Sequence, residues 1–172
     1  NYFVLFRPLH IVSGDFFWAK QVGNYKIFTA ADCTGHGVPG AFVSMLGVSF
    51  LAEIVRRKNV NKASQILEIL RTEIKTSLKQ TGDFNESKDG MDMALCMLNV
   101  NTNELQYSGA NNPMVLIRNN ELTEYRATRN PVAVYINEKP FENHTVKIEK
   151  DDVIYLFSDG YQDQHGGPQN RK

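Results

Sequence analysis

The chain has 172 residues, of which 42% are hydrophobic, and this is enough to build one domain with a sizeable core. Its 19 basic and 19 acidic residues cancel, so no net charge recruits nucleic acid or an anionic membrane, and we expect neither contact from this domain. Cys33 and Cys96 are the only cysteines and lack CxxC spacing, which argues against a disulfide framework or a thiolate zinc site and favours the cytoplasm. A membrane anchor elsewhere in the parent protein stays open.

The first half of the chain predicts three strands and two helices. Residues 2–6, 15–19 and 25–30 are rich in aromatic and β-branched side chains and are separated by Gly or Pro, which is typical of strands. From Val38 to Val55 the apolar residues occupy so many helical faces that we expect a buried helix. Asn61 is a candidate N-cap for a second helix whose apolar residues recur every three or four positions, which predicts one buried face.

The second half predicts strands after a polar loop over residues 81–90. These strands are short and are joined by turn residues such as Asn101 to Asn103 and Asn119–Asn120. The order of strands, then two helices, then strands indicates an α+β fold rather than alternating β-α-β units. The expected strands cover residues 91–100, 104–107, 114–118, 122–126, 145–148 and 153–157.

Acidic turns follow two of these strands and precede a third. Asp32 comes after the strand at 25–30, Asp159 after the strand at 153–157, and Asp15 follows Gly14. A half-buried carboxylate at a strand end is costly without a counter-charge, and a neighbouring glycine lets backbone and ligand approach closely. A hard divalent cation with oxygen ligands satisfies both conditions. Taken singly, Asp15 also fits a turn residue, and Asp32 an N-cap.

Several short stretches, in this order along the chain, resemble the SpoIIE-like bacterial branch of the metal-dependent protein phosphatases (the PPM, or protein phosphatase 2C-like, family). The resemblance implies two stacked, mainly antiparallel β-sheets flanked by helices, an α-β-β-α sandwich with metals at one end of the sheets. The matching stretches cover residues 12–18, 31–41, 89–92, 107–113, 158–161 and 164–167.

The same resemblance assigns roles to the acidic turns. Asp15 and Asp32 are expected to bind metals, with Asp32 bridging, while the backbone carbonyl of Cys33 and the carboxylate of Asp159 add ligands. Oxygen-only ligands favour Mn²⁺ or Mg²⁺, and the complete domain is expected to hold two ions. The implied reaction is hydrolysis of phosphoserine or phosphothreonine by a metal-activated water, without a phospho-enzyme intermediate.

Three further positions have weaker assignments. Asp92 shares its Gly-Met-Asp context with the family, but a solvent-facing strand residue is an equally good interpretation. His36 lies between glycines, where a local structural role is favoured over contact with phosphate. The Asn111 to Pro113 stretch also matches, yet it is first of all a turn between strands.

The resemblance also concerns what surrounds the domain. We expect residues 1–172 to form a single phosphatase domain excised from a larger signalling protein, downstream of a sensor or receiver domain. The family's further metal-binding aspartate would lie past Lys172, so the fragment is expected to lack its C-terminal segment, and whether it is active alone stays open. The implied substrate is a phosphorylated regulatory protein such as an anti-sigma-factor antagonist. The two helices would act as a switch, in some members through a homodimer.

Two other functions are compatible with parts of the sequence. Residues 35–40 satisfy the GxGxxG pattern of dinucleotide-binding sites, but two consecutive helices follow instead of a second parallel strand. That context argues against nucleotide binding. A non-catalytic regulatory or protein-binding module that retains the phosphatase fold stays open as the alternative to an enzyme.

Overall fold

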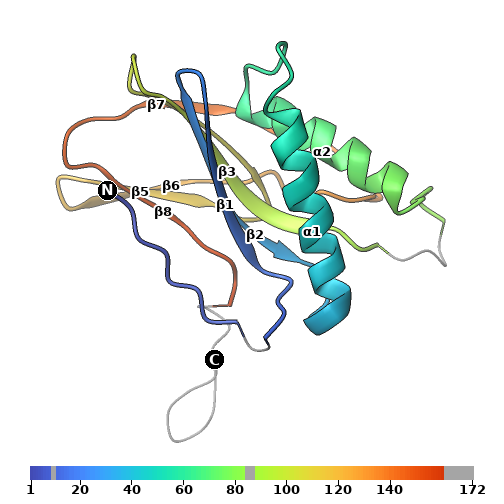
Figure 1. The fold of residues 1–172 in the computed structure, drawn as a ribbon. Helices are drawn as coiled ribbons and strands as arrows, with labels where there is room; N and C mark the ends of the chain where they lie inside the picture. The colour runs from blue at the N-terminus through green and yellow to red at the C-terminus, as the bar shows by residue number, and fades with distance from the viewer. Residues whose placement is uncertain (9–10, 84–87, 161–172) are drawn as a thin grey trace, which may run out of the picture.

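Two antiparallel sheets and two helices make up residues 1–8, 11–83 and 88–160, which are the residues that the computed structural model describes (Figure 1). One sheet has five strands in the order β1-β2-β3-β4-β7, and the other has three in the order β6-β5-β8. The elements are β1 (Phe16–Val22), β2 (Tyr25–Cys33), α1 (Gly37–Ile54), α2 (Ala63–Ser77), β3 (Met91–Asn99), β4 (Glu104–Ala110), β5 (Met114–Arg118), β6 (Glu121–Tyr125), β7 (His144–Lys147) and β8 (Val153–Leu156).

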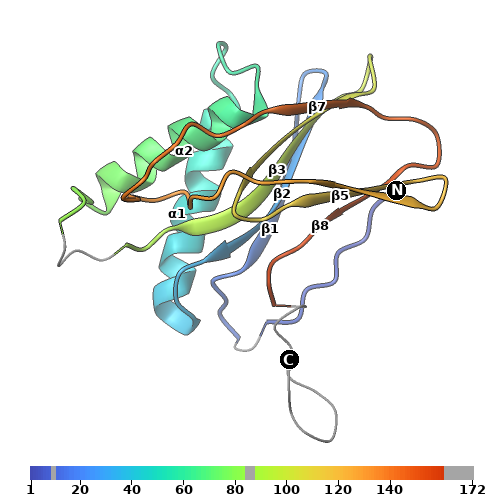
Figure 2. The ribbon, with the colours of Figure 1, turned by 180° about the vertical axis from the view of Figure 1, so that it is seen from behind.

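The elements stack in three layers. Helices α1 and α2 cover one face of the five-stranded sheet, and the three-stranded sheet lies on its other side (Figures 1 and 2). Strand β3 serves both interfaces because successive side chains point to opposite faces: Met93, Leu95 and Met97 belong to the core under the helices, whereas Ala94 and Cys96 belong to the core between the sheets. The expected α+β class with two stacked sheets is confirmed. Antiparallel pairing in both sheets excludes the parallel dinucleotide-binding fold.

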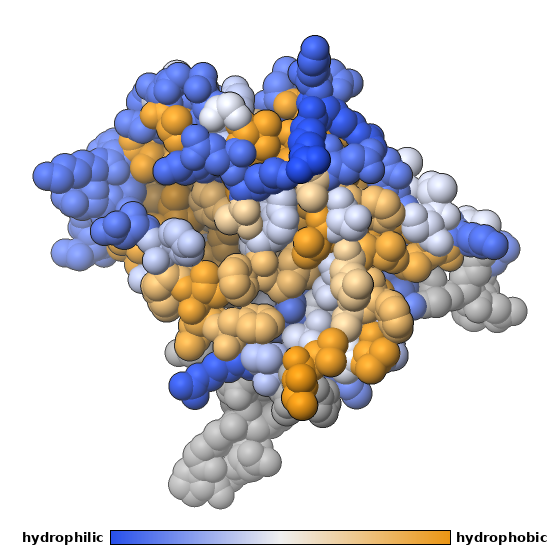
Figure 3. Space-filling model, in the orientation of Figure 1, coloured by the Kyte–Doolittle hydropathy of each residue, from blue (hydrophilic) through white to orange (hydrophobic). Residues whose placement is uncertain are grey.

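Helix α1 was expected to be buried on most faces, and this is wrong. Val38, Phe42 and Met45 are 59%, 64% and 67% exposed, and their spacing places them on one outward stripe. The inward face instead carries small residues that let the helix lie close to the sheet, since a Cβ added at Gly47 would come within 2.9 Å of Met91 Cε. Apolar side chains gather on the face of the molecule that carries α1 and β1 (Figure 3).

By length and composition alone, α1 is also long and apolar enough to cross a membrane, and it is the one such helix among the described residues. A core helix of a folded domain meets the same criterion, and Leu51 and Ile54 of α1 are fully buried against the rest of the domain. The property therefore carries little weight by itself.

Helix α2 has the expected single buried face, formed by Ile66, Leu67, Leu70 and Ile74. Its N-cap is Lys62 rather than Asn61, and the Lys62 side chain makes no capping hydrogen bond. The free N–H groups of the first turn are bound from outside the helix. Ala63 N donates to Gln106 Oε1, and Ser64 N donates to Asn143 Oδ1.

The strand expected over residues 2–6 is absent. Residues 1–8 form no strand and are exposed, with Tyr2 at 92% and Phe3 at 78%, although the Phe6 ring makes an edge contact with Phe17. A strand is stabilised by pairing with a neighbour, and these residues pair with none of the described strands. The other strands form as expected, with their ends shifted by at most three residues, and both cysteines are free and buried.

Candidate functional site

Two aspartates face each other across neighbouring strands at one end of the five-stranded sheet. Asp32 on β2 and Asp92 on β3 are direct antiparallel partners, so their side chains lie on the same face. By alternation, this face is the one that carries Ala94 and Cys96 in the core between the sheets. Both carboxylates therefore lie at the edge of the inter-sheet core.

Asp15 and Asp159 reach the same place from other elements. Phe16 on β1 pairs with Ala31, which puts Asp15, the residue before it, beside Asp32. Asp159 follows β8 of the second sheet, and both Asp15 and Asp159 interact with the Asp32 carboxyl by side-chain hydrogen bonding and by charge. The structure thus brings together the three aspartates that the sequence singled out, from both sheets.

Crowding changes the acidity of this cluster. Burial, together with the neighbouring carboxyl groups of Asp15 and Asp159, raises the pKa of Asp32 from 3.8 to about 8, and burial is the largest of these causes. Burial likewise raises the pKa of Asp92; the hydrogen bond from Asn111 opposes this shift, and the charge of Asp159 adds to it. Among the described residues, no lysine or arginine forms an ion pair with any of these carboxylates. Within the described part of the chain, the counter-charge is therefore left to protons or to a bound cation.

Close backbone packing holds the turn after Asp32 against the turn before Asp15. A Cβ added at Gly14 would lie 2.9 Å from the Cys33 carbonyl oxygen and 2.7 Å from that of Gly35. Gly35 itself has φ +85°, a conformation that favours glycine. The Cys33 carbonyl, expected as a ligand, therefore lies next to Asp15.

Two hydroxyl groups hold Asp15. Its backbone N–H donates to Ser13 Oγ over 3.0 Å, and its Oδ2 accepts a hydrogen bond from Ser158 Oγ over 3.4 Å. Ser158 precedes Asp159, so this contact also joins the acidic turns of the two sheets. These bonds place Asp15 with its carboxylate directed toward the second sheet.

The residue at the N-cap of α1 is His36, so the capping role considered for Asp32 is excluded. The His36 side chain makes no capping hydrogen bond, and its backbone is extended, with φ −125° and ψ 167°. The local structural role favoured for His36 from the sequence stays a prediction.

Asn111 is a site residue that the sequence reasoning treated as a turn. Its Nδ2 donates to Asp92 Oδ1 over 2.8 Å, and its φ of +59° places it in the left-handed region, where Asn is tolerated. The backbone conformation belongs to the expected turn, but the side chain orients the Asp92 carboxylate. The family-like stretch around Asn111 was the signal for this role.

The cluster offers carboxylate, carbonyl and hydroxyl oxygens, a donor set that suits a hard divalent cation. Within residues 1–8, 11–83 and 88–160, however, no three carboxylate, imidazole or thiol side chains are grouped so as to hold a metal ion. The arrangement is thus a set of neighbouring acidic groups, and the ligand roles of Asp15, Asp32, Cys33 and Asp159 stay a prediction.

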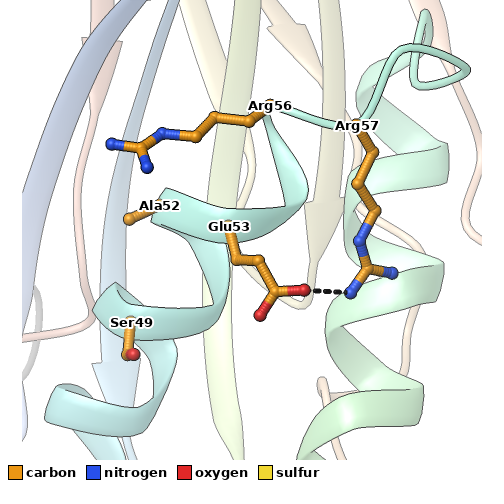
Figure 4. A pocket seen from close by; sticks show the side chains of 5 residues that line it. All are labelled: Ser49, Ala52, Glu53, Arg56 and Arg57. Atoms are coloured by element: carbon orange, nitrogen blue, oxygen red, sulfur yellow. Dashed lines mark hydrogen bonds and ion pairs between the residues drawn. The ribbon is translucent and has the colours of Figure 1, made fainter.

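A surface hollow at the other end of α1 does not belong to this site. It is lined by Ser49, Ala52, Glu53, Arg56 and Arg57 (Figure 4). Arg57 is paired there with Glu53 and Glu73. Helix α1 has 18 residues, which at a rise of about 1.5 Å per residue separates its ends by roughly 25 Å. The hollow is therefore remote from Asp32.

Comparison with known proteins gives one family. The model of the stage II sporulation protein E (SpoIIE) family matches residues 23–172. No curated protein sequence matches the chain.

Solved structures share the fold. The SiaA-PP2C domain of Pseudomonas aeruginosa is 24% identical with a TM-score of 0.84, over 98% of this chain and 65% of that one. The RsbU and RsbW domains of Rv1364c from Mycobacterium tuberculosis are 21% identical with a TM-score of 0.73, over 93% of this chain and 42% of that one. RsbX in complex with magnesium is 17% identical with a TM-score of 0.64, over 91% of this chain and 69% of that one. The chain thus spans less than two thirds of the first two.

Proposed function

Because the chain belongs to the SpoIIE family of PP2C-like phosphatases, we propose that it is a metal-dependent protein serine/threonine phosphatase. Its substrate would be phosphoserine or phosphothreonine on a bacterial regulatory protein. The meeting of Asp15, Asp32 and Asp159 from both sheets carries this proposal. Hydrolysis of a phosphate monoester needs such a concentration of charge because the uncatalysed reaction is among the slowest known.

Asp15, Asp32, Asp159 and the Cys33 carbonyl would hold Mn²⁺ or Mg²⁺, two ions in the complete domain. When bound, the ions would activate water and neutralise the phosphoryl oxygens. Hydrogen bonds orient the carboxylates of this cluster: Ser13 and Ser158 bind Asp15, and Asn111 binds Asp92. The magnesium complex of RsbX supports the choice of a hard divalent ion.

The protein substrate and the neighbouring domains are also proposals. The Mycobacterium tuberculosis protein carries RsbU and RsbW domains together, which supports a phosphatase domain that works beside other regulatory domains. A phosphorylated antagonist of an anti-sigma factor is the substrate we propose. An upstream sensor or receiver domain and a homodimer are predictions of the same kind.

The test is Mn²⁺-dependent hydrolysis of an aryl phosphate and of a phosphoserine peptide. Because this chain covers 65% of the SiaA-PP2C domain, the assay compares it with a form that continues past Lys172. Activity should require Mn²⁺ and should fall at least about a hundredfold in Asp32→Asn, since this carboxylate is proposed to bridge the ions. The matched control is Asp151→Asn, which removes the same charge from an exposed turn where φ is +69° and Asn is well tolerated.

The alternative is a protein-binding module without catalysis. One observation favours it: the described carboxylates form no closed group that would hold an ion. If neither form of the protein hydrolyses phosphate or binds Mn²⁺, while Asp32→Asn leaves the fold intact, the enzymatic proposal is wrong and this alternative takes its place.

A further inference from the structure

The C-terminal end of α2 is built to present one buried side chain. Lys79 has φ +53°, Lys79 N donates to Thr76 O, and Gln80 N donates to Lys75 O. This pair of hydrogen bonds around a left-handed residue is the Schellman motif, which ends a helix in a fixed geometry. Gln80, the next residue, is only 8% exposed. Its backbone position is therefore set by the helix end.

The Gln80 carboxamide joins two segments that are distant in sequence. Its Nε2 donates to Asp89 O, and its Oε1 accepts from Val134 N over 3.1 Å. The two segments also touch each other directly: Val132 N donates to Met91 O over 2.8 Å, and a Cβ added at Gly90 would lie 2.3 Å from Ala133 Cβ. Gln80 thus fixes the backbone that leads into β3.

That same backbone holds the turn after Asp32. Thr34 N donates to Gly90 O over 2.9 Å, and Gly90 N donates back to Thr34 Oγ1 over 3.2 Å. Thr34 follows Cys33 directly, and Cys33 is paired with Met91. A continuous path of hydrogen bonds therefore runs from the end of α2 through Gln80, Asp89–Gly90 and Thr34 to the Asp32–Cys33 turn.

We propose that Gln80 is a positioning residue for the Asp32–Cys33 turn, acting through Asp89–Gly90 and Thr34. This inference rests on the proposed function for its effect on metal binding, but the hydrogen-bonded path stands without it. A buried amide that satisfies one donor and one acceptor on different segments is expensive to replace, because each change leaves a backbone group unpaired. Residues that orient ligand-bearing backbone typically change metal affinity by about 10- to 100-fold when altered.

The chain contains a matched control at the other end of α2. Gln106 also uses both ends of its amide, accepting from Ala63 N and donating to Asn61 O. It pairs with Met97 through β3 and β4, away from the Met91 end where the aspartates lie. Gln80→Glu and Gln106→Glu remove the same N–H donor from two amide bridges, only one of which leads to the site. Gln80→Met tests the same bridge without adding a charge.

Two measurements separate the outcomes. Amide hydrogen exchange of Thr34 in metal-free protein should speed up about tenfold in both Gln80 variants and stay unchanged in Gln106→Glu. Mn²⁺ titration should show affinity weakened about tenfold or more in the Gln80 variants only. Unchanged Thr34 exchange in both Gln80 variants overturns the proposal, as does faster exchange with unaltered Mn²⁺ affinity. If Thr34 exchange is faster in the Gln80 variants but the unsubstituted chain binds no Mn²⁺, the hydrogen-bonded path is supported and the proposed metal site is rejected.

Discussion

Asp32 and Asp92 are direct cross-strand partners on β2 and β3, and no described lysine or arginine pairs with either. Two carboxylates placed opposite each other destabilise a sheet. Asp15 and Asp159 add their charge to Asp32. The fold thus concentrates acidic groups at one end of its inter-sheet core.

The metal-free protein should lose stability as the pH rises. The pKa of Asp32 is about 8 in the fold against 3.8 ordinarily, so folding favours the protonated carboxyl. The protonated Asp32 carboxyl therefore contributes fully to the free energy of unfolding below about pH 4, and this contribution is lost as the pH rises toward 8. In the presence of a chelator, the melting temperature should fall between pH 5 and 8 more steeply in the parent chain than in Asp32→Asn. Equal slopes in the two proteins would contradict the raised pKa.

Mg²⁺ or Mn²⁺ should reverse this loss. At pH 8 the ionised carboxylates are the form that binds a cation, and a ligand that binds only the folded state stabilises it. Added Mn²⁺ should therefore raise the melting temperature of the parent chain and of Asp151→Asn, but not of Asp32→Asn. A similar rise in all three proteins would indicate binding elsewhere.

Gly14→Ala should disturb the site through the backbone. The new Cβ would meet the carbonyl oxygens of Gly35 and Cys33, and such overpacking typically costs about 1–3 kcal/mol. Because the Cys33 carbonyl must move, Mn²⁺ affinity should also fall. The comparison is Gly23→Ala, which is strained by its φ of +54° but has open space around the added Cβ. It should lower the free energy of unfolding without changing Mn²⁺ affinity.

Arg71 should be a major stabiliser of the segment between β6 and β7. It is 5% exposed, donates to Lys139 O over 3.0 Å, pairs with Glu68, and stacks over the Phe141 ring at 4.4 Å. The Glu68 side chain is 37% exposed, so the pair is only partly buried. Leaving the partners of a buried hydrogen-bonding group unsatisfied costs about 1–3 kcal/mol, so Arg71→Met should lower the free energy of unfolding by about this amount in a urea titration. Arg57→Met is the control, because Arg57, like Arg71, pairs with glutamate on the helices but is more exposed. A stability change as large in Arg57→Met would contradict this account.

The exposed stripe of α1 predicts a contrast within one helix. Phe42→Ser should change the free energy of unfolding by less than about 0.5 kcal/mol, as is usual for surface positions. Leu51→Ala, at a fully buried position, should cost about 2–5 kcal/mol. Thermal unfolding of both variants tests whether α1 is exposed on the face that carries Phe42 and buried on the face that carries Leu51.

Local patterns were sufficient to predict most elements but not the exposure of α1. Alternation and turn residues located the strands from β1 to β8, and the spacing of Ile66, Leu70 and Ile74 identified the buried face of α2. Composition could not show which face of α1 is exposed, because both of its faces are apolar. Residues 2–6 have strand-like side chains without a described neighbour to pair with, and pairing is a property of the whole sheet.

The site was predictable where the chemistry lay in the residue type. Asp15 and Asp159 stood out because each lies close to a predicted strand and next to a glycine or serine, and Asp32 because it follows a strand-like run and precedes Gly35 and Gly37. Asn111 and Gln80 did not, because their roles depend on contacts with Asp92 and with Asp89, which register and helix termination bring about. Such contacts between distant segments leave no spacing signature in the sequence.

Titration of the chain with Mn²⁺ at pH 8, followed by the electron paramagnetic resonance signal of the free ion, measures whether Asp32 and Asp159 bind a divalent ion. We expect saturable binding by the unsubstituted chain and by Asp151→Asn, and binding weakened at least about tenfold in Asp32→Asn and in Asp159→Asn. Binding of equal strength in all four proteins, or no binding in any of them, would contradict the claim that these aspartates form a divalent metal site.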